Sequence, residues 1–205
     1  ILPGEGWSWF NHTGATIYGT PMNLSALAFN ILMGISGGII GAWLITRDPF
    51  WMMSGALAGI ISVASGLDIY FPAVTFIVAF VAGLILKPAA NILESLGIDD
   101  AVGAVTVHGT IGLYGVVALG IFGAGYPALQ GAAGEVATVS FLGQLVGAIV
   151  FGLVGFVPGY LVSLLLGWLG MLRTPEAAEL AGLDPAKVPA AAYPEGIPAS
   201  QPPST

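Results

Sequence analysis

Residues 101–123 read AVGAVTVHGTIGLYGVVALGIFG. About 20 apolar residues in a helix cross the hydrocarbon core of a bilayer, and this stretch is long enough. It contains no Asp, Glu, Lys or Arg, and its one side chain that ionises near neutral pH is the imidazole of His108. An ionisable group inside a membrane is costly, and by default it marks a pathway, a relay or a binding site. The stretch therefore predicts a transmembrane helix whose histidine has a function.

The composition of the whole chain also indicates a membrane protein. Of its 205 residues, 56% are hydrophobic and 7% charged, whereas soluble domains carry about 25% charged residues. A formal net charge of −7 excludes electrostatic binding of nucleic-acid phosphates, and the absence of cysteine excludes thiolate chemistry. No catalytic set, metal-ligand spacing or phosphate loop appears in the sequence, so we expect neither an enzyme nor a cofactor.

Charged residues divide the chain into long apolar runs. We predict an all-α integral membrane protein with about five complete transmembrane helices and the end of one more, because the runs lack the alternation of a membrane barrel. Residues 1–14 are expected to be that helix end, so the chain is expected to be a fragment, a processed product or one half of a larger unit. The complete spans are predicted at 23–46, 50–67, 71–89, 101–123 and 138–170.

The basic residues predict the orientation. Arg47, Lys87 and Arg173 lie at or just beyond the ends of the first, third and fifth spans, so alternating spans place all three on one side. The positive-inside rule makes that side cytoplasmic. We therefore expect a transmembrane domain at 1–173 in the cell (inner) membrane and a cytoplasmic tail at 174–205. The tail holds seven of the fourteen prolines and is expected to be partly disordered.

Small residues recur four positions apart within the spans. This spacing lets helix backbones approach closely, and it predicts a tightly packed bundle. On a regular helix His108 shares a face with Gly112 and Gly115, which would leave room for a narrow lumen beside the imidazole. The alternative for His108 is a hydrogen bond between helices that contributes to packing. The small-residue pairs are Gly34/Gly38, Gly37/Gly41, Gly55/Gly59, Gly143/Gly147 and Gly155/Gly159.

The opening GWSWFNHTG, residues 6–14, gathers aromatic side chains near the predicted outer face. Trp7, Trp9 and Phe10 are either anchors at the membrane interface or an aromatic vestibule that attracts a cation. His12 is expected to lie near the outer boundary, away from a pore.

Two acidic sites are expected to be structural. Asp68 precedes Tyr70 and Pro72 at the end of a span, where a turn or a helix cap explains it. Asp99 and Asp100 precede the helix of His108, where acids interact favourably with the helix dipole.

Four stretches, in this order, resemble the ammonium transporter (Amt/Rh) family. They match its C-terminal half, from the end of the sixth helix to the cytoplasmic tail. The stretches are GWSWFN at 6–11, SGALAGIISVASG at 54–66, DDAVGAVTVHGTIGLYGVVALGIFG at 99–123 and GMLRTPEAAELAGLD at 170–184.

The resemblance implies half of an eleven-helix bundle of two inverted repeats, which forms a homotrimer with one pore per subunit. In the family, ammonium is recruited at an aromatic vestibule and loses a proton, and ammonia then crosses a His-lined hydrophobic pore. By position, Trp7 precedes the gate, Phe10 is a gate phenylalanine and His108 is the second of two facing pore histidines. Thr13 is nearest to the vestibule serine. The residues that correspond to the regulatory tail, where a PII-type signalling protein docks, are Arg173, Gly182, Leu183 and Asp184.

The chain also departs from the family pattern. The family aspartate five residues before the pore histidine is Gly103 here, and a later His-x-x-Glu of the tail is replaced by Val-Pro-Ala-Ala at 188–191. The resemblance implies that the first five helices come from the rest of the polypeptide or from a separate subunit. The alternative function is that of a non-transporting ammonium sensor or a structural subunit of a membrane assembly.

Overall fold

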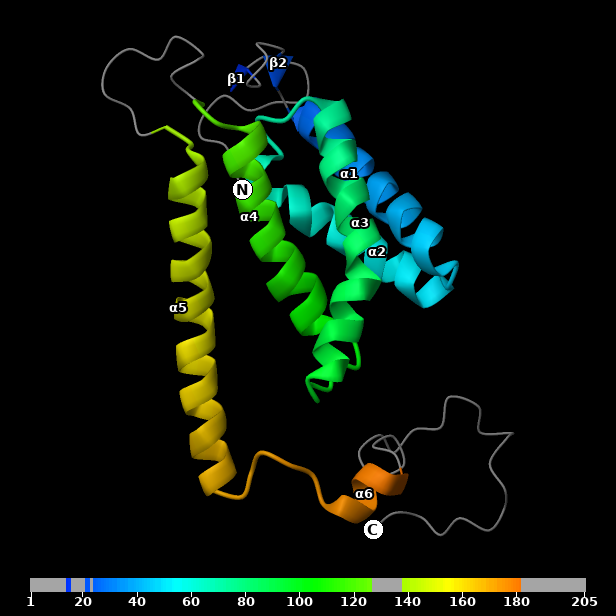
Figure 1. The fold of residues 1–205 in the computed structure, drawn as a ribbon, viewed down its shortest axis with the longest axis vertical. Coiled ribbons are helices and arrows are strands. Elements are labelled where there is room, and N and C mark those ends of the chain that lie inside the picture. Colours follow the sequence, from blue (N-terminus) through cyan, green and yellow to red (C-terminus); the bar gives the residue numbers. More distant parts are fainter. Residues whose placement is uncertain (1–13, 16–20, 23, 127–137, 182–205) are drawn as a thin grey trace. The chain divides into compact units, whose positions relative to one another are not determined.

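The structure, a computed structural model, describes residues 14–15, 21–22, 24–126 and 138–181 (Figure 1). It divides into an N-terminal unit, Ile1–Leu153, and a C-terminal unit, Val154–Thr205. This division falls within one long helix, α5. The division at 153–154 reflects how the residues pack. The predicted boundary at 173–174 instead separates the membrane domain from the tail, and it stays a prediction.

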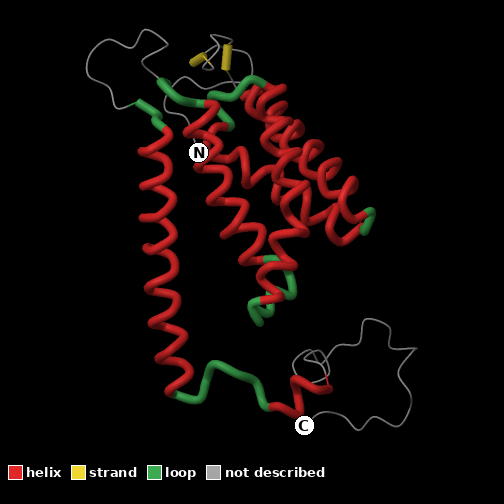
Figure 2. Tube along the Cα trace, viewed as in Figure 1, coloured by secondary structure: helices red, strands yellow, loops and turns green. Residues whose placement is uncertain are grey.

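Most of the described chain is helical (Figure 2). Among the described residues, five helical stretches are long and apolar enough to cross a membrane, and each overlaps one of the five predicted spans. This confirms the predicted fold class. The stretches are α1 (Leu24–Thr46), α2 (Pro49–Val63) with the 3₁₀-helix η1 (Ala64–Gly66), α3 (Pro72–Ser95), the π-helix η2 (Val105–Thr110) with α4 (Ile111–Phe122), and α5 (Phe141–Trp168).

Local signals explain where α2 and α3 begin. The Asp48 carboxylate accepts a hydrogen bond from the N–H of Phe50 at 2.8 Å, and Pro49 occupies the first turn of α2. Pro72 takes the same place in α3. A proline is tolerated there because the first helical N–H groups have no partner within the helix.

The predicted end of the third span, at residue 89, is wrong by six residues, because α3 continues to Ser95 with Pro88 inside it. The prediction ended the span where charge and proline appear. A helix does not have to end where its apolar run ends, and the last turns of α3 carry the exposed polar residues Asn91, Glu94 and Ser95.

Glycines on α1 bring it into backbone contact with α2 and α3. A Cβ at Gly38 would overlap the carbonyl oxygen of Gly55 and lie 2.8 Å from the Cα of Gly59. On another side of α1, a Cβ at Gly37 would lie 2.5 Å from the carbonyl oxygen of Phe76. The predicted close packing is therefore confirmed for the pairs on α1 and α2. A Cβ at Gly147, Gly155 or Gly159 would meet no described atom within 4 Å, so the pairs on α5 stay a prediction.

A buried asparagine ties α1 to the connection between α2 and α3. The side-chain amide of Asn30 donates hydrogen bonds to the carbonyl oxygens of Leu67 and Tyr70, at 3.0 and 2.9 Å. Asp68 lies in this connection, in a turn, as predicted. Buried apolar side chains from α2, α3 and α4 surround the connection, so it forms part of the core of the N-terminal unit.

Most of the expected helix end at 1–14 lies outside the described residues. Two short strands are described near it, β1 (Gly14–Ala15) and β2 (Pro21–Met22). They pair antiparallel, with Gly14 opposite Met22 and Ala15 opposite Pro21. Among the described residues, all other regular elements are helices.

The C-terminal unit contains the second part of α5 and the short helix α6 (Glu176–Ala181). Pro158 lies inside α5, and the helix continues through it. The tail from residue 182 onward lies outside the described residues, so its predicted disorder stays a prediction.

The packing at Gly38 predicts the effect of one added methyl group. Gly38→Ala should lower the stability by about 1–3 kcal/mol, because the methyl group has to displace the backbone of α2. Ser36→Ala, at an exposed position on the same helix, should change it by less than about 0.5 kcal/mol. Thermal unfolding of the purified protein in detergent measures both. Equal melting temperatures for the two variants would contradict the packing.

Candidate functional site

The described residues include two of the predicted site residues, His108 and Arg173. The others lie outside the described residues, and their predicted roles stay predictions. These are Trp7, Phe10 and Thr13 of the gate and vestibule, and Gly182, Leu183 and Asp184 of the tail.

His108 lies on the π-helix η2, which leads directly into α4. The N–H of Ile111 donates to the carbonyl oxygen of Thr106, five residues earlier, as this wider helix requires. Single π turns within α-helices occur frequently at functional sites. The sequence did not predict this turn, because a π turn has no composition signal comparable to a helix cap or a proline.

The helix of His108 has two different sides. Val107 and Ile111 are buried in a cluster with Ala58, Ala82 and Leu86 of α2 and α3. His108 itself is exposed, as are Val105 at 46% and Leu113 at 44%. In the part of the chain that the structure describes, no hydrogen bond to the imidazole is found. A role as a link between these helices therefore has no contact to support it.

The prediction that Gly112 and Gly115 both leave room beside His108 is wrong for Gly115. A Cβ at Gly115 would lie 2.6 Å from the carbonyl oxygen of Ser62, so this glycine serves close packing with α2. The π turn contributes to the difference, since it changes the rotation between His108 and the residues that follow. Gly112 keeps its open surroundings, where a Cβ would meet Ile61 at 3.9 Å.

Asp100 holds the start of this helix. One carboxylate oxygen accepts from the N–H of Val105 at 2.9 Å, and the other accepts from the N–H and the hydroxyl of Thr106 at 2.8 and 2.7 Å. The structural role predicted for Asp100 is thus confirmed. Desolvation alone would raise the pKa of Asp100, but these hydrogen bonds outweigh it, and the pKa lies below its ordinary value.

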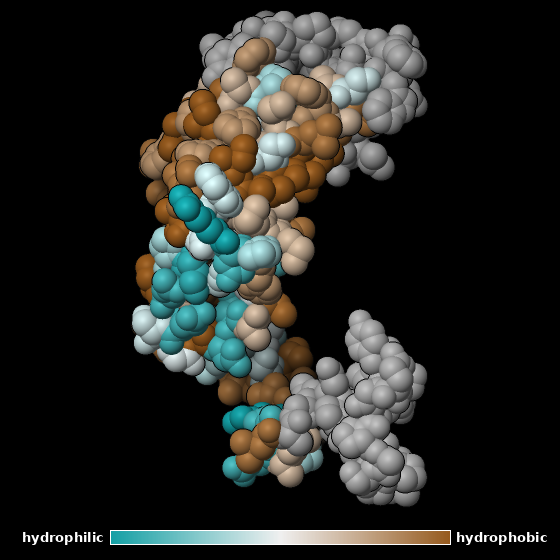
Figure 3. Space-filling model, turned by 90° about the vertical axis from the view of Figure 1, so that its right-hand side faces the viewer, coloured by the Kyte–Doolittle hydropathy of each residue, from teal (hydrophilic) through white to brown (hydrophobic). Residues whose placement is uncertain are grey.

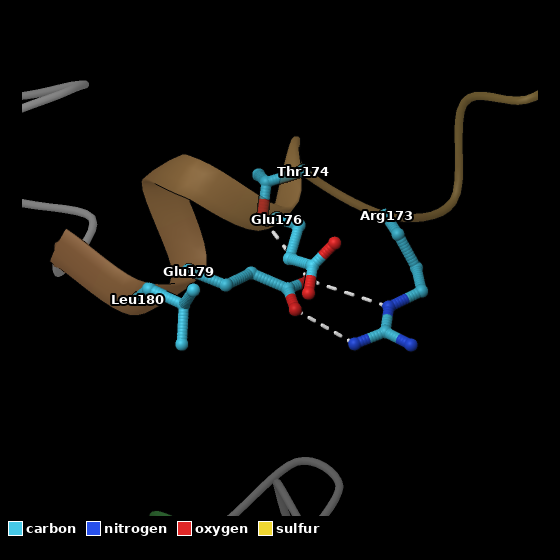
Figure 4. A pocket seen from close by; sticks show the side chains of 5 residues that line it. All are labelled: Arg173, Thr174, Glu176, Glu179 and Leu180. Atoms are coloured by element: carbon cyan, nitrogen blue, oxygen red, sulfur yellow. Dashed lines mark hydrogen bonds and ion pairs between the residues drawn. The ribbon is translucent and has the colours of Figure 1, made fainter.

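Arg173 lies in a pocket of the C-terminal unit, at the start of α6 (Figure 4). Its guanidinium donates to both carboxylate oxygens of Glu179, at 2.7 and 3.2 Å, and the Thr174 hydroxyl is within 3.4 Å of one of them. These hydrogen bonds and the charge of Glu179 raise the pKa of Arg173. The ion pair links the segment after α5 to α6. The pocket is lined by Arg173, Thr174, Glu176, Glu179 and Leu180.

The described residues contain no group of three or more metal-ligating side chains. The geometry instead defines a class of protein. It is a multi-pass helical membrane protein in which one ionisable side chain lies on an uncovered face of a membrane-length helix.

Comparison with known proteins identifies the family. A model of the Ammonium Transporter Family matches residues 5–193, and the chain therefore belongs to the ammonium transporter family. Its members are transporters and not enzymes, in agreement with the prediction from the sequence.

The chain is similar to archaeal ammonium transporters. It is 38% identical over 193 residues to Amt1 and 34% identical over 192 residues to Amt2, both of Methanocaldococcus jannaschii. It is 31% identical over 205 residues to Amt2 of Archaeoglobus fulgidus. These matches cover 93%, 93% and 94% of this chain but 48%, 44% and 44% of the relatives. The chain thus spans about half the length of the curated relatives that it matches.

Removing the Asp100 carboxylate should destabilise the N-terminal unit. We expect Asp100→Ala to cost about 1–2 kcal/mol, because the N–H groups of Val105 and Thr106 lose their acceptor. Asp99→Ala is the matched control, since Asp99 is exposed and no hydrogen bond to it is found among the described residues. Thermal unfolding in detergent compares the two variants, and equal losses would contradict the role of Asp100.

The lowered pKa of Asp100 also predicts a pH dependence. Its stabilising contribution is present above the ordinary pKa of 3.8 and is lost as the pH falls through the lower pKa of the folded state. The difference in melting temperature between the unmodified protein and Asp100→Asn should therefore be larger at pH 6 than at pH 3. A difference that stays constant over this range would argue against a stabilising carboxylate.

Proposed function

We propose that this chain supplies the C-terminal half of an ammonium transporter, from the end of the sixth helix to the cytoplasmic tail, and one wall of its pore. One observation carries the proposal. His108 lies on an uncovered face of a membrane-length helix in a chain of the ammonium transporter family. His108 is the fourth residue of η2, within a stretch of membrane length that contains no Asp, Glu, Lys or Arg. An ionisable side chain within such a stretch marks a function or a partner by default.

The proposed mechanism separates the proton from the cation. Ammonium would first meet the aromatic side chains of Trp7 and Phe10, whose ring faces attract a cation, with Thr13 nearby. Carrying a cation through a hydrophobic lumen is costly, whereas neutral ammonia crosses it at much lower cost. Ammonium therefore gives up its proton, ammonia continues along the lumen, and the imidazole of His108 holds or relays a proton.

The pore requires a second half. Without covering helices, the imidazole of His108 would lie against lipid, because it is on the exposed side of η2 and α4 with Val105 and Leu113. The relatives are about twice as long as the region that they share with this chain. We propose that the covering helices are those of the other half, from the same polypeptide or a separate subunit, and that the complete unit forms a homotrimer.

The proposed orientation places the C-terminus in the cytoplasm. Arg47 and Lys87 each lie over a tryptophan ring, Arg47 at 5.3 Å from the centroid of Trp43 and Lys87 at 4.5 Å from that of Trp51. Basic residues favour the cytoplasmic side, and tryptophan favours membrane interfaces. Both pairs support a common cytoplasmic interface of the cell (inner) membrane.

The tail is proposed to receive a PII-type signalling protein. The Arg173–Glu179 ion pair lies at the start of this tail, and Gly182, Leu183 and Asp184 follow it in the sequence. The pair is exposed, so it is weak and readily exchanged for contacts with a partner.

A second candidate is a non-transporting ammonium sensor or structural subunit. Gly103, at the place of the family aspartate, has a backbone φ of 72°, which residues with a Cβ rarely adopt. An aspartate therefore does not fit this backbone without strain. This observation favours a changed function, whereas the uncovered His108 favours transport.

Substitution of His108 distinguishes these roles. In the intact transporter that contains this chain, His108→Asp should abolish ammonium uptake into proteoliposomes or change its selectivity, while the trimer still assembles. Uptake with unchanged rate and selectivity would contradict a pore role. Failure of assembly would instead identify His108 as a packing residue.

A matched control uses another exposed side chain of a membrane-length helix. Ile77→Ala alters an exposed side chain of α3, 52% exposed, and should leave uptake unchanged. If neither the unmodified protein nor the control conducts ammonium, the sensor or structural role replaces transport.

A further inference from the structure

Asp68 lies in the turn between α2 and α3, where its carboxylate makes no structural contact with the described residues. The carboxylates of Asp48 and Asp100 each accept hydrogen bonds from N–H groups at the start of a helix. For Asp68, no hydrogen bond or ion pair of the carboxylate is found in the described part of the chain. Helix α3 begins at Pro72, directly after Phe71. The sequence allowed a turn or a helix cap for Asp68, and the structure supports the turn.

A turn does not by itself require a carboxylate. Asparagine forms such turns as well as aspartate does, and it carries no charge. Asp68 is half-buried, and its neighbours Leu67 and Ile69 are only 7% and 4% exposed. Removing water from a carboxylate is unfavourable unless a positive charge compensates. The carboxylate of Asp68 therefore indicates that a cation comes close to this turn.

The basic residues of this chain are not placed to supply that cation. In the proposed orientation Asp68 follows the second span and lies on the outer side, whereas the four basic residues belong to the cytoplasmic side or the tail. On the face drawn in Figure 3, hydrophilic side chains gather over the lower part of the N-terminal unit, and apolar side chains cover much of the part above. The cation therefore comes from outside this chain. The four basic residues are Arg47, Lys87, Arg173 and Lys187.

The turn of Asp68 packs against the outer end of the helix that continues from His108. Ile69, next to Asp68, belongs to a buried cluster that includes Leu119 of α4. A Cβ at Gly123, directly after α4, would lie 3.2 Å from the side chain of Ile69. Asp68 therefore lies beside the outer end of the helix that forms the proposed pore wall.

Tyr126 lies near Asp68 but does not neutralise it. Its side chain, four residues beyond the end of α4, packs against the same buried cluster. Burial and the negative charge of Asp68 raise the pKa of Tyr126. The phenol therefore stays neutral at physiological pH, and the charge of Asp68 remains available to a cation.

We propose that Asp68 attracts ammonium to the outer end of the pore and raises its local concentration before it enters. This inference rests on the proposed transport function. The attraction needs no direct contact, because two unit charges 5–10 Å apart in water favour each other by a factor of about two to four. A basic side chain from the other half of the transporter would instead cancel this attraction, and the experiment below separates the two cases.

The test measures the uptake of radiolabelled methylammonium, a cation with the same charge as ammonium. The intact transporter is expressed in cells that lack other ammonium transporters, so the added substrate meets the outer face alone. At low ionic strength Asp68→Asn should raise KM by about two- to fourfold and leave the maximal rate per transporter unchanged. The difference should shrink at about 150 mM salt, where charges are screened over about 8 Å.

Three further variants separate the charge of Asp68 from its place in the turn. Asp68→Glu keeps the charge and should keep the KM of the unmodified protein. Asp68→Lys reverses the charge, so KM should rise by about the square of the effect of Asp68→Asn, roughly four- to sixteenfold. Asp99→Asn removes an exposed carboxylate from the proposed cytoplasmic side and should leave KM unchanged.

Several results would overturn the inference. An unchanged KM in Asp68→Asn at low ionic strength would show that the charge attracts no substrate. A rise in KM that salt does not reduce, or a lower maximal rate at unchanged KM, would show that Asp68 holds a structural contact with the other half. These outcomes leave the proposed transport function standing. Absence of uptake by the unmodified protein would overturn that function and this inference together.

Discussion

Helices α2 and α3 can both lie against α1 because Gly37 and Gly38 have no Cβ. A single methyl group at either position would meet a backbone oxygen of the neighbouring helix. In lipid there is no hydrophobic force between helices, so close backbone packing has to hold them together. The remaining features follow from this contact. The connection after α2 reaches Asn30 of α1, and η2 with α4 packs onto the surface that α2 and α3 form.

The sequence predicted the helices well, because the cost of charge in a membrane limits where spans begin and end. All five spans were found, and the role of Asp100 followed from its place before a helix. Three features were not predictable by these rules. Helix α3 continues past Pro88, because the buried side chains of Leu86 and Ala90 on either side hold it against its neighbours and offset the cost of the proline. The π turn at His108 has no composition signal. Gly115 packs against Ser62, because helix spacing does not tell which side of a helix meets a neighbour.

The sequence identified His108 as a candidate site residue, but it did not predict what surrounds this side chain. Its place in a long apolar stretch identified His108, and the structure places it on the side of its helix that α2 and α3 leave uncovered. The chain belongs to the ammonium transporter family and covers about half the length of its curated relatives. In our proposal the uncovered side is one wall of a pore, and the opposite wall comes from helices that the relatives possess beyond the shared region.

An experimentally determined structure of the intact membrane assembly, with the surroundings of His108 resolved, tests this account most directly. The account predicts that the imidazole faces a narrow lumen between η2–α4 and helices from outside this chain, with Gly112 beside it and Gly115 still against α2. An imidazole that faces lipid, or one enclosed between packed helices with no lumen beside it, would contradict the account.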